Sequence, residues 1–318
     1  MSAKNIIIAT LGVILLGLVQ CKSFKRSKMI QESMSSHTIH WDGYERKFLQ
    51  HLPPREKMNK PMPILFHLHG GGGTAKGTAG FTYGRFNELS DKDGFIVVYP
   101  DAIKKHWNDG RTSDIETSWK DNIDDVGFIV SIIDTLKKQY NIDTTRIFTV
   151  GMSNGGFMSS RLICDKANLF RGAAILTATI SVDYLPKCRP SKGTAVMVIN
   201  GTADPLVPYN GGQIKVLKKD RGAIISTDSF IHYWQKINHC KTHFVRKLKD
   251  TKDDGTSVTI KEFGGCTKGA SLVLYTIENG GHTWPQGKQY LGERIIGKTS
   301  QEFNACDVIW DYFKNLKP

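Results

Sequence analysis

The sequence lacks several features that would place it outside the ordinary globular proteins. No internal repeat of about 20–50 residues is present, which argues against solenoids and propellers. Only one long apolar run occurs, which excludes a membrane protein with several spans. The 31 glycines and 11 prolines are scattered, which excludes collagen-like and low-complexity chains. Charged residues make up 23% of the 318 residues, so disorder is not expected and the chain can bury a sizeable core.

Acidic residues are fewer than basic ones, and the formal net charge is +13. Five basic residues and one glutamate between positions 1 and 36 account for four of these charges, which leaves nine for the remainder. The remaining lysines and arginines are dispersed and are not interleaved with aromatic residues, so nucleic acid is not an expected partner. Two interpretations of the charge stay open: solvated lysines that aid solubility, and attraction to an acidic polymer or an anionic surface.

The one apolar run lies at the N-terminus. Lys4 precedes the stretch Ile6–Val19, which is too short for a membrane-spanning helix of about 20 residues but suits the core of a signal peptide. The end of this stretch and the next two residues, Leu18-Val19-Gln20-Cys21, resemble a bacterial lipobox, which implies a lipid on Cys21 and attachment to a membrane. A soluble secreted protein and an uncleaved anchor are the alternatives.

These N-terminal features divide the chain into three parts. Residues 1–21 are expected to be a signal peptide of the lipoprotein type, and residues 22–36, rich in lysine and serine, a flexible tether. No linker composition appears after residue 37, so residues 37–318 are expected to form one domain. The protein is therefore predicted to be exported, and either secreted or lipid-anchored at the bacterial cell envelope.

The spacing of the cysteines supports export. No C-x-x-C pair occurs and no spacing fits a zinc site, so disulfides are expected instead of a metal. Cys240 and Cys266 flank a predicted hairpin and form the first expected pair, and Cys164–Cys188 is the second. Cys306 lies on a C-terminal helical pattern and is expected to be a buried free thiol. The alternative is that all are reduced in a cytosol.

Strands and helices alternate along the chain. Short apolar runs bounded by turn residues predict six buried parallel strands, at 63–69, 95–99, 146–150, 173–177, 195–200 and 271–277. Helical patterns lie between and after them, at 125–140, 154–166, 226–237 and 301–315. Two antiparallel hairpins are expected, from 37–41 with 44–52 and from 243–249 with 257–263. This alternation predicts an α/β fold with a mostly parallel central sheet and helices on both faces.

A motif for nucleophilic catalysis lies between a predicted strand and helix. Gly151-Met152-Ser153-Asn154-Gly155 fits G-x-S-x-G, and it follows the strand that ends at Val150. This strand–turn–helix context is the one that a nucleophile elbow requires, and its flanking residues must be small because the turn is sharp. Ser153 is therefore predicted to be a nucleophile at the positive end of a helix. A glycine-rich turn without chemistry is the alternative.

A second motif could hold the negative charge that develops during acyl transfer. His69-Gly70-Gly71-Gly72-Gly73 directly follows the apolar strand 64–68. Backbone N–H groups aimed at an oxyanion are needed there, and we expect the N–H groups of Gly71 and Asn154 to supply them. Binding of phosphate is the alternative, but no G-x-G-x-x-G is present and no Walker lysine follows.

A serine nucleophile needs a base, and the base needs a carboxylate to orient it. Among ten histidines, only His282 both follows the last predicted sheet strand and sits in a glycine loop, so it is the expected base. His67 and His69 are its rivals, and His69 is expected to brace the oxyanion loop instead. Asp204 follows the strand 195–200 and completes the order Ser, acid, His of the α/β hydrolases. The aspartates that precede Ser153 break that order: Asp101, Asp124 and Asp125.

These motifs together resemble a known family. The segments that carry the resemblance are HLHGGGG (67–73), DDVGF (124–128), GMSNGG (151–156), NGTADPLVPYNGG (200–212) and GGHTWP (280–285). The family is that of the secreted polyhydroxybutyrate depolymerases and feruloyl esterases, related to carbohydrate esterase family one. The resemblance implies an α/β-hydrolase fold over residues 37–318, a serine esterase mechanism without a cofactor or metal, and the triad Ser153, Asp204 and His282.

The expected substrate is an ester on a polysaccharide, feruloyl or acetyl, or a short hydroxyalkanoate ester. Trp284, Trp107 and Trp119 are interpreted as walls of the substrate pocket together with His69, because aromatic walls suit all of these substrates. Core packing is the alternative for each tryptophan. A serine peptidase of the same fold is a second functional hypothesis, although it would carry an added gating domain. A non-catalytic binding lipoprotein is a third, although it would lack a triad member.

Overall fold

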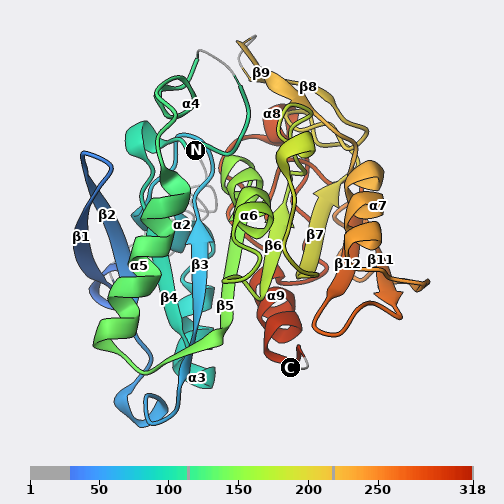
Figure 1. The fold of residues 1–318 in the computed structure, drawn as a ribbon. Coiled ribbons are helices and arrows are strands. Elements are labelled where there is room, and N and C mark those ends of the chain that lie inside the picture. The colour runs from blue at the N-terminus through green and yellow to red at the C-terminus, as the bar shows by residue number, and fades with distance from the viewer. Residues whose placement is uncertain (1–28, 113–114, 217–218, 317–318) are drawn as a thin grey trace, which may run out of the picture.

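The computed structural model describes residues 29–112, 115–216 and 219–316, and its largest element is a ten-stranded sheet (Figure 1). The strand order is β1-β2-β4-β3-β5-β6-β7-β12-β11-β10. The six strands from β4 to β12 in this order are parallel, and an antiparallel pair extends the sheet at each end. The bounds are β1 Ser35–Trp41, β2 Tyr44–His51, β3 Met62–Leu68, β4 Ile96–Pro100, β5 Ile142–Met152, β6 Gly172–Leu176, β7 Ala195–Gly201, β10 Thr242–Lys247, β11 Ser257–Gly264 and β12 Ser271–Glu278.

The central strands are continuous apolar runs because both of their faces are covered. Every residue of β3, β4, β6 and β7 is buried. Two separate clusters of buried side chains lie on the two faces. One contains buried apolar residues of α5, α6 and α7, and the other contains those of α2, α3 and α9. Figure 1 shows α5, α6 and α7 in front of the sheet. The predicted α/β architecture is confirmed.

The four predicted helices are present with small shifts at their ends. Their bounds are α5 Asp125–Gln139, α6 Asn154–Asp165, α7 Thr227–Ile237 and α9 Ala305–Lys314. Serine and asparagine begin two of them, because Ser226 caps α7 and Asn304 caps α9 through side-chain oxygens that accept backbone N–H bonds. Both predicted hairpins also occur, as β1–β2 and β10–β11, and the parallel strands all form as expected.

Several short elements were not predicted. They are α2 Ala75–Phe81, α3 Arg85–Asp93, α4 Thr117–Lys120, α8 Glu293–Ile296, the hairpin β8 Gly212–Val216 with β9 Lys219–Ile224, and the 3₁₀ turns η1 Arg55–Lys57, η2 Ile103–Lys105 and η3 Leu185–Lys187. α2 buries only small side chains, Ala75, Thr78 and Ala79, so it has no apolar periodicity that a sequence pattern could show. Tertiary packing holds these elements, not intrinsic propensity.

The N-terminal predictions are tested only in part. Cys21 and the proposed signal peptide lie outside the described residues. From residue 29 onward the proposed tether is part of the folded domain, because Ile30 and Met34 pack against the cluster that holds α2, α3 and α9. β1 begins at Ser35, two residues before the expected start of the domain. No helix within the described ranges has the length and apolar character needed to cross a membrane.

Two disulfides join the residues that the sequence paired. Cys240 is bonded to Cys266, and Cys164 is bonded to Cys188, while Cys306 is a buried free thiol. The first disulfide connects the turn between α7 and β10 to the loop after β11, and the second connects the end of α6 to the end of the turn η3. The second therefore ties a helix to a neighbouring loop.

Replacement of Cys240 and Cys266 by alanine should lower the free energy of unfolding. Their sequence separation is 26 residues, and loss of the closed loop increases the entropy of the unfolded chain, so the expected loss is about 3–4 kcal/mol. Urea denaturation of the oxidised wild type and of the double variant measures it, with the wild type under reducing conditions as a control. An unchanged midpoint and slope in the double variant would contradict the role given to this disulfide.

Candidate active site

Ser153 occupies a sharp reversal of the chain between β5 and α6. β5 ends at Met152, α6 begins at Asn154, and Ser153 between them has φ 58° and ψ −125°. A backbone of this kind costs about 1–3 kcal/mol in a residue other than glycine, and it persists only where the surroundings hold it. Here the N–H of Ser153 donates to the carbonyl of Leu176 at the end of β6, over 2.9 Å. The sharp strand–turn–helix reversal that a nucleophile elbow requires is therefore present.

The glycine that follows the turn is required by close packing. A Cβ atom on Gly155 would lie 2.4 Å from the carbonyl oxygen of Leu68 and 2.6 Å from that of His69. Such contacts are not tolerated, so only glycine lets the first turn of α6 approach the end of β3. This approach places the start of α6 beside the glycine loop 70–73.

The second part of the site is a buried pair formed by His282 and Asp204. Nδ1 of His282 lies 2.7 Å from Oδ2 of Asp204, and both side chains are almost fully buried. The other carboxylate oxygen, Oδ1, accepts the N–H groups of Leu206 and Val207, each at 2.8 Å. Because Asp204 is acceptor-only when ionised, Nδ1 carries the proton and Nε2 keeps a free lone pair.

The two loops that carry this pair leave neighbouring strands, β7 and β12. They meet at a glycine contact, since a Cβ on Gly201 would lie 2.2 Å from the carbonyl oxygen of Gly280. Ala203 N–H also donates to the Gly280 carbonyl over 3.0 Å. The loop of His282 is held on its other side, because its N–H donates to the carbonyl of Ile296 over 2.6 Å. The imidazole thus sits on backbone fixed from both sides.

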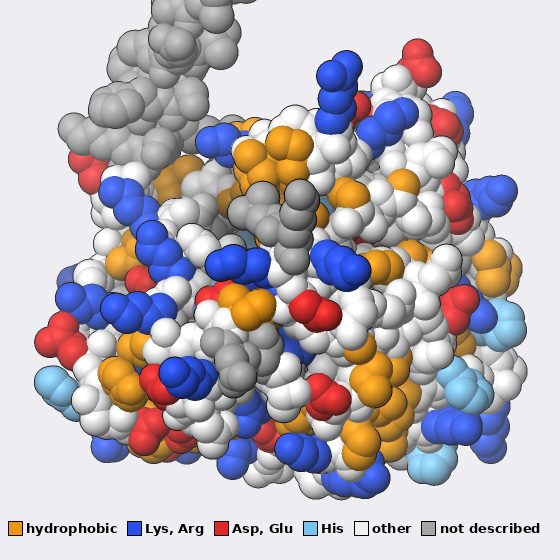
Figure 2. All heavy atoms as spheres, turned by 90° about the horizontal axis from the view of Figure 1, so that it is seen from above, with side chains coloured by type: hydrophobic (Ala, Val, Ile, Leu, Met, Phe, Trp, Pro, Cys, Tyr) orange, Lys and Arg blue, Asp and Glu red, His pale blue; other side chains and the backbone are white. Residues whose placement is uncertain are grey.

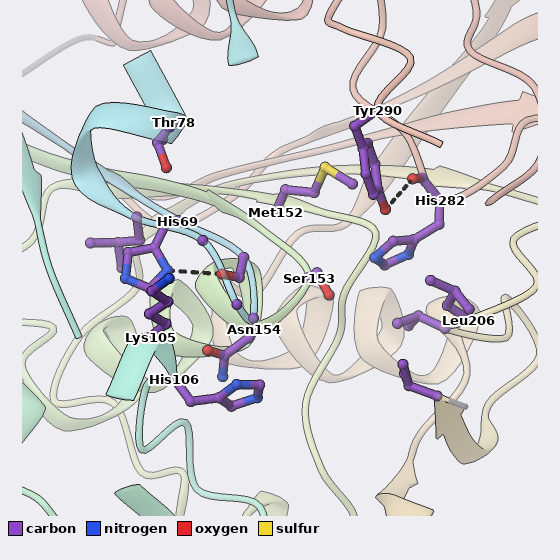
Figure 3. A pocket seen from close by; sticks show the side chains of 18 of the residues that line it. His69, Thr78, Lys105, His106, Met152, Ser153, Asn154, Leu206, His282 and Tyr290 are labelled. Carbon is purple, nitrogen blue, oxygen red and sulfur yellow. Dashed lines mark hydrogen bonds between the residues drawn. The ribbon is translucent and has the colours of Figure 1, made fainter. Parts of the chain in front are cut away.

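Ser153 and His282 line one cavity of about 640 Å³. Figure 3 shows the hydroxyl of Ser153 and the imidazole of His282 turned toward the same hollow, from the elbow and from the loop after β12. Within the described residues the Ser153 hydroxyl forms no hydrogen bond to the imidazole, so this contact is not made in the free protein. Geometry of this kind tightens when a substrate binds.

The aspartates that precede Ser153 have other partners. Oδ1 of Asp101 accepts the N–H of Ala75 at the start of α2, and Asp124 caps α5 through Gly127. Asp125, the first residue of α5, forms a buried ion pair with Arg46 at 2.5 Å. Burial raises the pKa of Asp125, and the guanidinium of Arg46 opposes that shift. All three side chains therefore serve the fold near the site.

The two rival histidines are neutral and buried. Burial lowers the pKa of His67 to about 3, and its ring packs against Phe86, Tyr99 and Trp284. Nε2 of His69 accepts the N–H of Ala102 at 3.0 Å, so Nδ1 donates to the Gly70 carbonyl at 2.8 Å. Burial also lowers the pKa of His69. His69 thus braces the glycine loop 70–73 through Gly70.

The glycine loop leaves few N–H groups available to a substrate. The N–H of Gly72 donates to Lys105 and that of Gly73 to Gly70, each over 2.9 Å. Gly71 N–H forms no hydrogen bond within the described residues, and Asn154 N–H is the first of α6. These two predicted donors therefore stay available beside Ser153.

Only one of the three tryptophans that were predicted to line the substrate pocket does so. Trp284 lines the cavity, and so does His69. Trp107 lies behind the wall, where its Nε1 donates to the carbonyl of His69 over 2.9 Å, and Trp119 lies behind Trp107 and donates to its carbonyl. The interpretation of Trp107 and Trp119 as pocket walls is wrong, because their indole N–H groups are satisfied by buried backbone.

Several lining residues had no signal in the sequence. His106, Glu116 and Arg221 form one wall of the cavity, and Tyr290 forms part of another. Arg221 comes from β9, a strand that was not predicted, so its approach to His106 over 115 positions has no local pattern. Within the described ranges, no group of three or more His, Cys, Asp or Glu side chains is arranged to hold a metal ion.

The chain is similar to known esterases in its sequence. Residues 47–184, which include Ser153, match the family model described as Esterase PHB depolymerase. This match covers less than half of the chain and supports the esterase family that the motifs resemble. A protein of Nocardia uniformis subsp. tsuyamanensis named as an esterase, NocK, is 25% identical over 281 residues, which are 85% of this chain and 79% of that one. Feruloyl esterase B of Piromyces equi is also 25% identical, over 76% of this chain but only 44% of that protein.

A solved structure has a fold similar to that of this chain. The acetyl xylan esterase from Aspergillus awamori has a TM-score of 0.56 to this chain at 12% identity, and the match covers 88% of this chain and 99% of that one. Its similarity and the strand order given above identify the α/β-hydrolase fold. With the esterases named among its relatives, the family match shows that the chain is a carboxylic-ester hydrolase.

The packing of the elbow predicts opposite effects for two glycine substitutions. Gly155→Ala should destabilise the esterase by about 1–3 kcal/mol, because the added carbon overlaps two backbone carbonyls, and ester hydrolysis should fall with it. Gly80→Ala is the control, since a Cβ there meets nothing within 4 Å in helix α2. Alanine should stabilise that helix by about 1 kcal/mol. Thermal unfolding with matched rate assays measures both. A Gly155→Ala enzyme with wild-type stability and rate would contradict the packing argument.

Proposed function

We propose that this esterase uses a serine triad in which Ser153 is the nucleophile, His282 the general base and Asp204 the carboxylate that orients the base. The observation that carries the proposal is the buried pair of His282 and Asp204 on the wall of the cavity that Ser153 also lines. The strained backbone of Ser153 supports it, since such strain clusters at functional positions. The three residues also follow the chain order of α/β hydrolases.

The proposed reaction begins when Ser153 Oγ bonds to the ester carbonyl carbon and its proton moves to Nε2 of His282. Asp204 stabilises the imidazolium through the hydrogen bond to Nδ1. The carbonyl oxygen becomes an oxyanion that the N–H groups of Gly71 and Asn154 bind. The bond to the alcohol oxygen then breaks, and the alcohol leaves with the proton from His282. Water hydrolyses the acyl-enzyme by the same steps and regenerates the serine.

The proposed substrates are feruloyl or acetyl esters on polysaccharides, or short hydroxyalkanoate esters. Support comes from the named activities of the relatives, which include feruloyl esterases and a bifunctional acetylxylan esterase/xylanase, and from the family model. The cavity is large enough for an aromatic acyl group, and it has aromatic side chains in Phe81, Trp284 and Tyr290. Release of ferulate from arabinoxylan, of acetate from acetyl-xylan and of hydroxybutyrate from its oligomers separates these substrates.

We also propose that the esterase is exported. The two disulfides support this, because such bonds persist in oxidising compartments. Attachment of a lipid to Cys21 remains a proposal from the sequence alone, and metabolic labelling with a palmitate analogue tests it. Incorporation that is lost in Cys21→Ser is expected, and absence of label in the wild type would contradict it.

Removal of triad members should abolish most of the hydrolysis of p-nitrophenyl acetate. Ser153→Ala should lose nearly all catalysis, and Asp204→Asn should lower kcat by about 10⁴-fold because the imidazole takes the wrong tautomer. Asp134→Asn, the same change on the exposed face of α5, is the matched control and should keep the wild-type rate. Equal rates in Ser153→Ala and the wild type would overturn the esterase mechanism. Full activity in Asp204→Asn would assign the carboxylate elsewhere.

A further inference from the structure

One wall of the catalytic cavity carries an excess of positive charge. Of the described residues that line the cavity, four are basic and only Glu116 is acidic. Arg111 is neutralised by Asp109, with the guanidinium and carboxylate 2.5 Å apart and both buried. Lys104 and Lys105 are exposed, and their side chains form no ion pair within the described residues. Two lysines and Arg221 therefore face a single carboxylate.

The side chain of Arg221 is held in place by the protein, but not all of its N–H donors have a partner within the described residues. Its Nη1 donates to Glu116 and lies 3.3 Å from Nε2 of His106, whereas Nη2 has no partner within the described residues. The side chain of Arg221 is 18% exposed to solvent, so this wall still presents guanidinium donors to the cavity. Burial lowers the pKa of His106 to about 4, so at neutral pH His106 adds no charge.

The lysines are fixed beside the oxyanion loop by a strained turn. Lys104 and Lys105 have φ angles of 50° and 61°, which are rare in residues other than glycine. The turn places the Lys105 carbonyl where it accepts the N–H of Gly72. It also brings the ring of His106 against Gly71, where an added Cβ would lie 2.5 Å from Cε1. A backbone strained at two successive residues is typical of a binding site.

The charged wall lies on the acyl side of the nucleophile. In Figure 3, Lys105 and His106 are on the opposite side of Ser153 from His282. His282 must give its proton to the leaving oxygen, so the alcohol lies toward His282 and the acyl group extends away from it. The wall formed by Leu206, Val207, Ile214 and Val216 is apolar and suits the hydrocarbon part of a substrate.

We propose that Lys104, Lys105 and Arg221 bind a carboxylate carried on the acyl group, so that the preferred substrates are esters of acids with a second, ionised carboxyl group. The proposal rests on the triad mechanism proposed above and names the substrate class of that site. Guanidinium and ammonium groups bind carboxylates through charge-assisted hydrogen bonds. The surrounding surface favours the approach of such an anion, because the view from above in Figure 2 shows Lys and Arg side chains spread over this end of the molecule.

The test compares two p-nitrophenyl esters that differ only at the end of the acyl chain. The hemiglutarate carries a carboxylate, and the valerate is a neutral ester of similar length. The wild type should have the higher kcat/KM for the hemiglutarate, and added salt should reduce that preference. The double variant Lys104→Gln/Lys105→Gln and the single variant Arg221→Gln should each lower the ratio of the two kcat/KM values by about tenfold, the size expected for a hydrogen bond between charged groups.

Two further variants separate recognition from damage to the fold. Glu116→Gln should raise the preference for the hemiglutarate, because it removes the one negative charge on the wall, whereas general damage would not change the ratio in that direction. Lys138→Gln removes a lysine from the exposed face of α5 and should leave the ratio unchanged.

Three results would overturn the proposal. The first is a wild-type preference for the neutral ester, and the second is a preference for the hemiglutarate that none of the lysine and arginine variants reduces. The third is a lysine-dependent preference for a butyryl ester of 3-hydroxybutyrate over its neutral analogue without any for the hemiglutarate, which would put the carboxylate on the alcohol side. Absence of hydrolysis of both p-nitrophenyl esters by the wild type would instead contradict the triad mechanism itself.

Discussion

The close approach of the first turn of α6 to the end of β3 is the constraint on which the whole site depends. It is possible only because Gly155 lacks a side chain, since two carbonyl oxygens lie within 2.6 Å of the position of a Cβ. The approach forces the chain to reverse within one residue, and Ser153 takes up the strain. The same packing places the N–H of Asn154 beside the glycine loop, so the proposed nucleophile and the proposed oxyanion donors share one rigid support.

The proposed base and its carboxylate are positioned independently of this reversal. Asp204 and His282 follow β7 and β12, which pair as parallel neighbours, so their loops leave the sheet at the same edge. Both oxygens of the Asp204 carboxylate accept hydrogen bonds, one from two backbone N–H groups and the other from the imidazole. The bond to the imidazole fixes the tautomer of His282. In the proposed mechanism, substrate binding has to complete only the last contact, between the imidazole and the serine hydroxyl.

Much of this arrangement could be predicted from the sequence, because parallel strands bring distant loops to one edge. The apolar runs located the strands, and the glycine motifs after them located Ser153, Asp204 and His282. The tryptophans were assigned wrongly, since nothing local shows whether an indole faces a cavity or donates to buried backbone, as Trp107 does. Helix α2 was missed because its buried face is made of small residues. The charged wall was missed because it joins segments more than 100 positions apart.

The most direct test of the account is covalent labelling with diisopropyl fluorophosphate, followed by peptide mapping. A serine activated by the pair of His282 and Asp204 should give one adduct, on Ser153, and the rate of labelling should fall by orders of magnitude in His282→Ala. An adduct on another residue, or labelling of Ser153 at the same rate in the wild type and in His282→Ala, would contradict the central claim that these residues act as one catalytic unit.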